Sequence, residues 1–262
     1  MENQPTRRER GRRRRRRSLG LSIVGVLGEL LLTAGVLVFL YLGWELFINN
    51  AIAGSAQSQQ ALALSRDWQS AYAAAPLTVD VPKSGEADTA GDIPAYAGTP
   101  AEAQVFATLI VPRFGADWSR PIAEGVGVED VLDTIGVGHY PGTAMPGQVG
   151  NFAVAAHRTT YGAPFFSINQ LDVGDSIYVE TQDGWYRYVF RAHEYVLPDG
   201  VSVLNAVPQV ADAAPTDRIM TMTSCNPLYS AAERYIAYAV LDSFTPRSAG
   251  PPSEIAKLYG GA

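Results

Sequence analysis

Two kinds of hydrophobic pattern divide the chain. Residues 21–42 are apolar almost without interruption, and Glu29 is their only charged residue. A helix of this length spans about 33 Å, which is enough to cross a hydrocarbon core of about 30 Å. Tyr41 and Trp44 stand at its end, where aromatic side chains line a membrane interface. The pattern therefore predicts a transmembrane anchor over residues 19–48.

Short β-type apolar runs separated by turn residues begin near residue 104. Asp183 and Gly184 give a strong hairpin signal between two of these runs. The candidate strands are Val105–Val111, Asn151–Ala156, Ser176–Glu180, Trp185–Tyr195, Arg218–Thr223 and Tyr235–Ser243. A short helix is expected over residues 129–133 and a helical turn over 164–171. Many closely spaced strands with little helix favour an all-β barrel or sandwich of about 140 residues.

The segments between the anchor and the strands have a different composition. Residues 49–75 are rich in Ala, Gln and Ser and are expected to form a helical stalk. Residues 76–100 are dense in Pro, Gly and Asp, which is typical of a flexible linker. We therefore expect a stalk and linker over residues 49–102, a globular domain over 103–246 and a C-terminal tail over 247–262.

Charge is distributed unevenly along the chain. Residues 1–17 hold nine Arg and two Glu, a net charge of +7, whereas the remainder carries −13. Positive charge beside an apolar segment stays in the cytoplasm, so we expect a cytoplasmic tail over residues 1–18, an anchor in the plasma membrane and an extracytoplasmic domain. A cleaved signal peptide is the alternative, because Ala51-Ile52-Ala53 resembles a cleavage site. The arginines could also bind anionic lipid or nucleic acid; we expect no nucleic-acid partner.

The composition excludes several classes of protein. With 262 residues, of which 47% are apolar, the chain can bury a core and is neither wholly disordered nor collagen-like. Its single cysteine, Cys225, can form neither an internal disulfide nor a multi-thiolate metal centre. No spaced cluster of metal ligands stands out in the sequence, so the predicted site contains no metal and no cofactor.

Three residues suited to acyl transfer lie at the ends of predicted strands. Cys225 follows an apolar run and is soon followed by Pro227, which favours an accessible thiol. A free thiol is unusual outside the cell because it oxidises there. His157 also follows an apolar run, and Arg234 begins the strand after Cys225, so that a hairpin would return its guanidinium toward the thiol. If these strands are neighbours, the three groups meet at one end of the barrel.

Each of these residues also has a structural interpretation. A buried, inert cysteine is common in proteins, and an arginine at the start of a strand is often solvated. His139 lies in a Gly-rich turn and His193 within a predicted strand, and for both we expect a hydrogen-bonding or surface role.

Cysteine, histidine and arginine together can perform covalent catalysis. A thiolate is the nucleophile, and a neighbouring imidazolium favours its formation. The histidine then protonates the leaving amine, and a cation beside the developing oxyanion stabilises the transition state. The resulting thioester is resolved by water or by an incoming amine.

These residues resemble the signature of the sortases, membrane-anchored cysteine transpeptidases of Gram-positive bacteria. The signature is a Thr-Leu-x-Thr-Cys strand end, with an arginine shortly after it and a histidine well upstream. Here Thr221-Met-Thr-Ser-Cys225 is followed by Arg234 and preceded, by 68 residues, by His157. Met222 and Ser224 depart from the signature but keep its apolar and hydroxyl character. The resemblance covers residues 103–246.

Two local strings are most similar to class E sortases of actinobacteria. One is His157-Arg-Thr-Thr-Tyr-Gly-Ala-Pro-Phe165, and the other is Cys225-Asn-Pro227. The resemblance implies a closed eight-stranded β-barrel. It also implies cleavage of a Leu-Ala-x-Thr-Gly-like sorting signal, between Thr and Gly, at the C-terminus of secreted proteins. The acyl group would then pass to an amine of lipid II or peptidoglycan.

The resemblance also implies roles for individual residues. Cys225 would be the nucleophile, His157 the general acid, and Arg234 the group that stabilises substrate and oxyanion. Tyr140 resembles a class E tyrosine tied to the preference for alanine in the signal. The substrate-binding residues expected on this basis are Tyr140, Thr223, Ser224 and Tyr161.

Two other functions remain open at this point. L,D-transpeptidases also combine Cys, His and Arg, but their cysteine lies in a Ser-x-Gly-Cys-x-Arg stretch, whereas Arg234 is nine residues from Cys225. A non-catalytic surface module with a vestigial thiol is the third hypothesis. Selective labelling of Cys225 by a thiol-reactive inhibitor, with loss of transfer, would separate the enzymes from the module.

Overall fold

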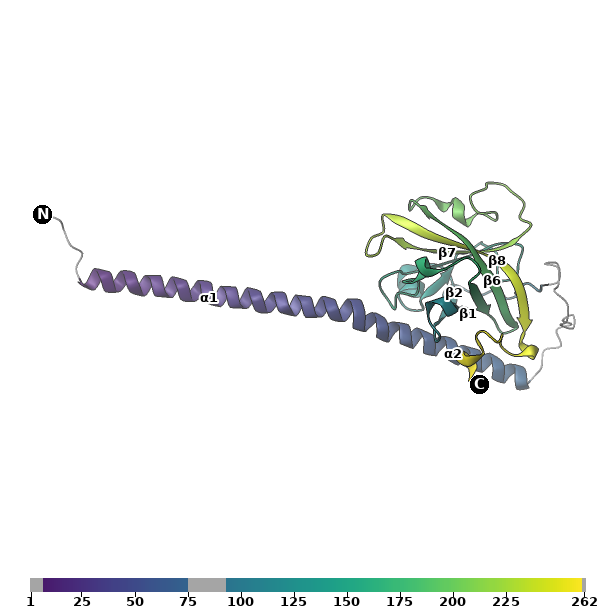
Figure 1. Ribbon diagram of the computed structural model, residues 1–262, viewed down its shortest axis with the longest axis horizontal. Helices are drawn as coiled ribbons and strands as arrows, with labels where there is room; N and C mark the ends of the chain where they lie inside the picture. The colour runs from purple at the N-terminus through teal and green to yellow at the C-terminus, as the bar shows by residue number, and fades with distance from the viewer. Residues whose placement is uncertain (1–6, 75–92, 261–262) are drawn as a thin grey trace. The chain divides into compact units, whose positions relative to one another are not determined.

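The described part of the N-terminal unit is helical throughout. The structure, a computed structural model, describes residues 7–74 and 93–260, and the chain divides into two units, residues 1–48 and 49–262. Helix α1 (Arg7–Gly43) leads into a π-helical turn, η1 (Trp44–Asn49) (Figure 1). Within α1, residues Ile23–Gly43 are long and apolar enough to cross a membrane. The N-terminal helix thus fits a membrane anchor.

The second unit is built on a closed eight-stranded barrel, as predicted. Its strand order is β1-β2-β3-β4-β7-β8-β6-β5, and neighbours are antiparallel except for the parallel pairs β2–β3 and β4–β7. The strands are β1 (Val105–Ile110), β2 (Ser119–Glu124), β3 (Val137–His139), β4 (Gly150–Ala156), β5 (Ser176–Glu180), β6 (Gly184–Val196), β7 (Arg218–Asn226) and β8 (Glu233–Pro246).

Short helical turns connect the strands. They are η2 (Pro112–Phe114), η3 (Val128–Leu132), η4 (Ile168–Gln170), η5 (Val201–Leu204), η6 (Arg247–Ala249) and η7 (Ala256–Tyr259). The helix expected over residues 129–133 corresponds to η3, and η4 lies within the turn expected over 164–171.

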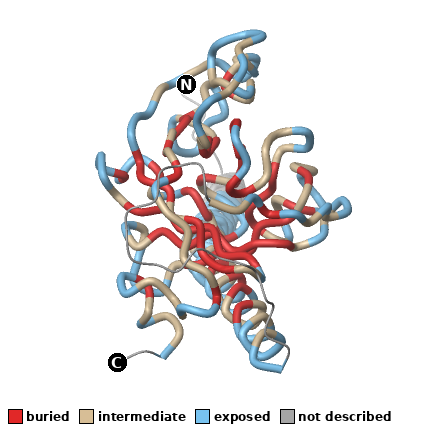
Figure 2. Tube along the Cα trace, turned by 90° about the vertical axis from the view of Figure 1, so that its right-hand side faces the viewer, coloured by how far each residue is buried: buried red, intermediate tan, exposed pale blue. Residues whose placement is uncertain are grey.

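The core fills the barrel. Buried residues concentrate in the strands (Figure 2), and all seven residues of β4 are buried. Aromatic rings occupy much of this interior: Phe152 stacks between His139 and Tyr188, with ring centroids 5.2 and 6.4 Å away. Burial of each large apolar side chain contributes about 1.5–3 kcal/mol to the free energy of unfolding, so the packed interior stabilises the barrel.

Helix α2 (Asn50–Ala74) packs against the barrel, although its sequence suggests a stalk. Ala61 and Ser65 are buried at the contact, which lies mainly along β2. The Asn50 side chain donates to the Thr159 carbonyl (2.7 Å), and Gln57 donates to the Tyr161 carbonyl (3.0 Å). Helix α2 therefore belongs to the domain. Of the linker expected over residues 76–100, residues 76–92 lie outside the described residues.

The segment after β8 also packs on the domain. Ile255 is buried against Trp185, and the Trp185 indole donates to the Tyr259 hydroxyl (2.9 Å). The guanidinium of Arg247 donates to Glu180 (2.9 Å), and both side chains are fully buried. The described part of the C-terminal tail thus packs against residues of β1, β5 and β6.

Candidate active site

The order of strands brings Cys225, His157 and Arg234 to one end of the barrel. Parallel strands β4 and β7 pair in register up to Ala155 and Thr223, so that two residues further on His157 stands level with Cys225. Strands β7 and β8 are antiparallel, and Cys225 is directly opposite Arg234. Opposed residues of neighbouring strands lie on the same face of a sheet. Three adjacent strands therefore carry the three side chains predicted to react.

The thiol has the exposure that a nucleophile needs. Cys225 is the second-last residue of β7 and is partly exposed, whereas Thr223 and Ser224 before it are buried. The Ser224 hydroxyl donates to the Ala156 carbonyl (2.9 Å) and so ties β7 to β4. This contact gives Ser224 a structural role directly behind the thiol.

The imidazole of His157 has a carboxylate partner. Its Nε2 lies 2.7 Å from Oδ1 of Asp133, which follows η3, and both side chains are about one-fifth exposed. Tyr161 covers the ring, with centroids 5.2 Å apart. The sequence singled out Tyr161 but gave no sign of Asp133, because the two partners are 24 positions apart and no local pattern links them.

The guanidinium of Arg234 is held by backbone. Its Nη1 donates to the carbonyl of Ala231, in the loop between β7 and β8, and to the carbonyl of Glu233, the first residue of β8, each at 3.0 Å. These contacts use one nitrogen of the fork, and a guanidinium has five N–H donors. A charged donor group is therefore positioned on the face that carries Cys225.

A second arginine, Arg158, lies beneath the site. It is 6% exposed, and its guanidinium donates to the Asn226 side-chain oxygen and to the Cys225 carbonyl (3.3 Å). It also lies 5.5 Å from the centre of the Tyr235 ring. Burial lowers the pKa of Arg158, whereas attraction to Tyr195, Tyr235 and Cys225 opposes that shift. The sequence analysis missed this residue; the only available signal was its position next to His157.

Tyr140 connects the loop after β3 to the strand of the thiol. Its hydroxyl lies 2.9 Å from the Thr223 hydroxyl, so two of the residues predicted to bind substrate are hydrogen-bonded to each other. The pair stands two residues before Cys225 along β7. A substrate bound along this strand end would meet both hydroxyl groups.

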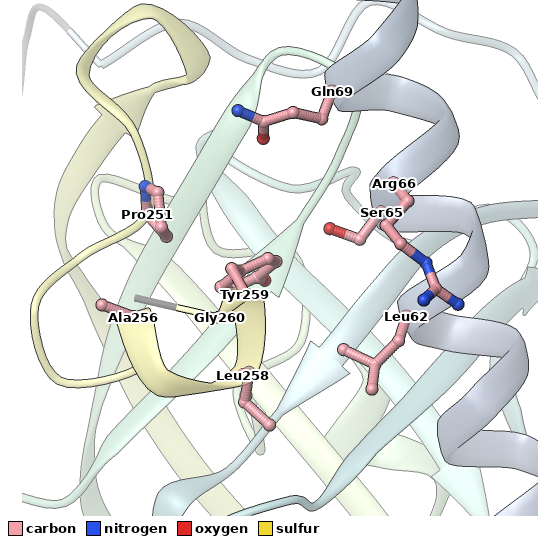
Figure 3. A pocket seen from close by; sticks show the side chains of 9 residues that line it. All are labelled: Leu62, Ser65, Arg66, Gln69, Pro251, Ala256, Leu258, Tyr259 and Gly260. Atoms are coloured by element: carbon pink, nitrogen blue, oxygen red, sulfur yellow. The ribbon is translucent and has the colours of Figure 1, made fainter. Parts of the chain in front are cut away.

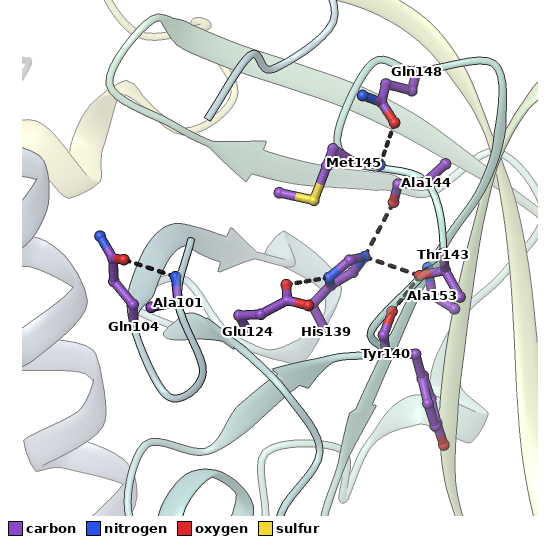
Figure 4. A network of polar contacts seen from close by, with 10 residues as sticks. All are labelled: Ala101, Gln104, Glu124, His139, Tyr140, Thr143, Ala144, Met145, Gln148 and Ala153. Atoms are coloured by element: carbon purple, nitrogen blue, oxygen red, sulfur yellow. Dashed lines mark hydrogen bonds and ion pairs between the residues drawn. The ribbon is translucent and has the colours of Figure 1, made fainter. Parts of the chain in front are cut away.

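His139 anchors the loop that carries Tyr140. Its Nδ1 lies 2.6 Å from Glu124, and its Nε2 lies 2.9 Å from the Thr143 hydroxyl and 3.1 Å from the Ala144 carbonyl (Figure 4). The sequence placed His139 in a turn, whereas it ends strand β3 and is buried; its expected hydrogen-bonding role is confirmed. His193 lies in β6 and stacks on Tyr235 at 5.3 Å.

The described residues show no metal centre. Among residues 7–74 and 93–260, no group of three or more His, Cys, Asp or Glu side chains is arranged to hold a metal ion. A groove of about 620 Å³ lies between α2 and the C-terminal segment (Figure 3). Ser65 and Tyr259 line it, whereas none of the predicted site residues does.

Comparison with known proteins identifies the family. The family model "Sortase domain" matches residues 109–242. Two curated relatives come from Streptomyces coelicolor. Sortase SrtE1 is 34% identical over 94% of this chain and 66% of its own length, so the chain spans about two thirds of that relative. Sortase SrtE2 is 32% identical over 88% of this chain and 87% of its own length.

A solved structure agrees with these matches. Sortase E1 from Streptomyces coelicolor, solved with a tripeptide in its active site, is 39% identical and superposes with a TM-score of 0.55 over 60% of this chain and 99% of that chain. The residues matched by the family model, 109–242, include His157, Cys225 and Arg234. The chain therefore belongs to the sortase family of cysteine transpeptidases, and the class E sortases SrtE1 and SrtE2 are among its relatives.

Proposed function

We propose that this protein cleaves a Leu-Ala-x-Thr-Gly-like sorting signal between Thr and Gly and joins the new C-terminus to an amine of lipid II or peptidoglycan. One observation carries the proposal: adjacent strands β4, β7 and β8 deliver His157, Cys225 and Arg234 to one end of the barrel. The class E relatives support the choice of signal.

The first half-reaction forms a thioester. The Cys225 thiolate attacks the threonine carbonyl carbon, and the electron pair of the C=O bond moves onto oxygen. The Arg234 guanidinium faces the same side as the thiol and stabilises this oxyanion. As the tetrahedral intermediate collapses, the C–N bond to glycine breaks and His157 gives its proton to the departing amine.

The second half-reaction reverses the roles. The acceptor amine attacks the thioester carbonyl and loses a proton to the neutral His157. Collapse of the second tetrahedral intermediate forms an amide bond and returns the Cys225 thiolate. The enzyme ends with thiolate and imidazolium, as it began, so the cycle balances in protons and bonds without a cofactor.

The signal is read beside the thiol. Tyr140 and Thr223 form a polar pair two residues before Cys225 on β7, and Tyr161 packs on His157. We assign substrate contacts to these three residues. Ser224 binds the Ala156 carbonyl, so its contribution is to hold β7 in place.

The helix α1 sets where the reaction takes place. We propose that Ile23–Gly43 crosses the plasma membrane, with the arginine-rich residues 1–18 in the cytoplasm and the barrel outside. The domain would then meet secreted proteins and lipid-linked cell-wall precursors at the outer membrane surface.

Replacement of the nucleophile tests the proposal. Full-length protein in detergent is incubated with a Leu-Ala-x-Thr-Gly peptide, and intact mass is recorded with and without an amine acceptor. Wild type should gain the mass of the acyl group, and Cys225→Ala should show neither the adduct nor cleavage. Because Cys225 is the only cysteine, any adduct on wild type reports on this residue. Unchanged cleavage by Cys225→Ala would exclude the assigned nucleophile.

A further inference from the structure

The side chain of Asp133 is fixed beside His157 by the fold around it. Asp133 caps η3, and its N–H donates to the Val128 carbonyl (2.8 Å). The helix is anchored by Val131, which is fully buried. Strand β3 begins four residues after Asp133 and pairs with β4, with Val137 opposite Ala156, the residue before His157. The connection from β2 to β3 thus holds the carboxylate at the exit of β4.

The contact with Asp133 determines which nitrogen of the His157 ring carries the proton. An ionised carboxylate only accepts hydrogen bonds. The 2.7 Å contact between Asp133 Oδ1 and His157 Nε2 therefore requires a proton on Nε2. The neutral ring then has its lone pair on Nδ1, which is the nitrogen left to exchange a proton with a reacting group. Fixing a tautomer in this way is a recognised function of a carboxylate behind a catalytic histidine.

We propose that Asp133 is a positioning residue, which orients the His157 ring and holds it in the tautomer with the proton on Nε2. This inference rests on the proposed function, in which His157 transfers the proton. Asp133 does not touch the sorting signal, so its removal should lower kcat and leave KM for the peptide nearly unchanged.

The same helix offers a matched control. Glu129 is exposed and lies four residues before Asp133, and within the described part of the chain its side chain forms no hydrogen bond or ion pair. Glu129→Ala removes the same charge from the same short helix without removing a partner of His157. Asp133→Asn keeps the shape of Asp133 and tests the carboxylate itself.

Kinetics with full-length protein in detergent measure the functional effect. We expect Asp133→Ala and Asp133→Asn to lower kcat by at least about 10-fold and by up to about 10⁴-fold, the loss that follows when the orienting carboxylate of a Ser-His-Asp triad is replaced by its amide. Glu129→Ala should stay within about twofold of wild type. Thermal unfolding of each variant separates loss of orientation from loss of fold. A kcat for folded Asp133→Asn equal to that of Glu129→Ala would overturn the proposal.

A spectroscopic measurement tests the tautomer independently of activity. The chain has three histidines, so selective ¹⁵N-histidine labelling gives a simple spectrum, and His157→Ala assigns the signal. In the Cys225→Ala background, the neutral His157 ring should show a protonated Nε2, and Asp133→Ala should convert it to a mixture of tautomers. The same mixture with and without Asp133 would contradict the inference.

The two proposals can fail separately. If His157→Ala retains transfer activity, the proposed mechanism is wrong, although the ¹⁵N spectrum still reports on the Asp133 contact. If His157→Ala is inactive while Asp133→Asn has wild-type kcat, the mechanism stands and only the role of Asp133 is excluded.

Discussion

The chain neighbours of the three proposed catalytic residues are joined by hydrogen bonds. Arg158 follows the histidine, Asn226 follows the cysteine, and Glu233 precedes the arginine. Arg158 donates to the Asn226 side-chain oxygen, and the Asn226 amide donates to Glu233 (2.9 Å). These bonds connect the ends of β4, β7 and β8 at the level of the site. They help to fix the distances between the side chains of His157, Cys225 and Arg234, which lie on different strands.

We expect Arg158→Met to lower both stability and the rate of acylation. Methionine retains much of the apolar stem but leaves the partly buried Asn226 oxygen and Cys225 carbonyl without this donor, and a hydrogen bond to a charged group contributes about 1.5–3 kcal/mol. Thermal unfolding and acyl-enzyme formation are measured on the full-length protein. Arg187→Met is the control, because its ion pair with Asp242 is partly exposed and such pairs contribute about 0–1 kcal/mol. Equal effects of the two changes would refute the bridging role of Arg158.

The sequence revealed the residues with distinctive chemistry and missed those whose role depends on a hydrogen bond to a residue distant in the chain. Cys225 and His157 stand out because each follows an apolar strand, and that pattern is local. Asp133 and Arg158 gain their roles from partners 24 and 67 residues away. Such distances become contacts only through the strand order, which hydrophobic periodicity does not encode.

Strand signals were strong where one residue after another is apolar and weak where the strand is short or polar. The six predicted strands are present, with β6, β7 and β8 longer than expected. Strand β2 was missed because it contains Arg120 and Pro121, and β3 because it has only three residues. Gly138 of β3 permits a close approach, since a Cβ there would lie 2.3 Å from the Gly125 carbonyl oxygen.

Helix α2 is joined to the barrel by a hydrogen bond to a buried carboxylate, that of Glu180. The Ser65 hydroxyl donates to Glu180 (2.7 Å), and Tyr259 donates to the other oxygen of that carboxylate (2.8 Å). Arg247 also binds Glu180 and lies between the rings of Trp68 and Trp185, at 5.6 and 4.6 Å. A buried carboxylate thus joins the barrel, the C-terminal segment and α2.

A fragment that begins at residue 76 should be less stable than one that begins at residue 49. It lacks α2, so Glu180 loses the Ser65 hydroxyl, a bond to a charged group worth about 1.5–3 kcal/mol, and the loop after His157 loses Asn50 and Gln57. Thermal unfolding of the two fragments should differ by several degrees, and Ser65→Ala in the longer one should account for part of the difference. Identical midpoints would show that α2 adds nothing to the domain.

At the scale of the whole molecule, the proposed anchor determines on which side of the membrane the Cys225 thiol lies. The apolar helix Ile23–Gly43 and the arginine-rich tail predict a single crossing with the domain outside. The only cysteine lies in the domain, so labelling of its thiol reports on which side of the membrane the domain lies.

A membrane-impermeant thiol reagent added to intact cells should label the wild-type protein. The matched control carries Glu2→Cys in the Cys225→Ala background and should be labelled only after the membrane is permeabilised. Labelling of the control, but not of wild type, in intact cells would reverse the proposed orientation.

The pairing of β7 with both β4 and β8 makes catalysis a property of the finished fold. Side chains alternate between the two faces of a strand, so a slip of one residue would turn the sulfur of Cys225 away from the guanidinium of Arg234 and out of step with the imidazole of His157. A newly made chain therefore holds every reactive atom, but we expect no acyl transfer before its strands have paired. The pairing of β8 with β7 is the step that completes the proposed site, because it places Arg234 opposite Cys225.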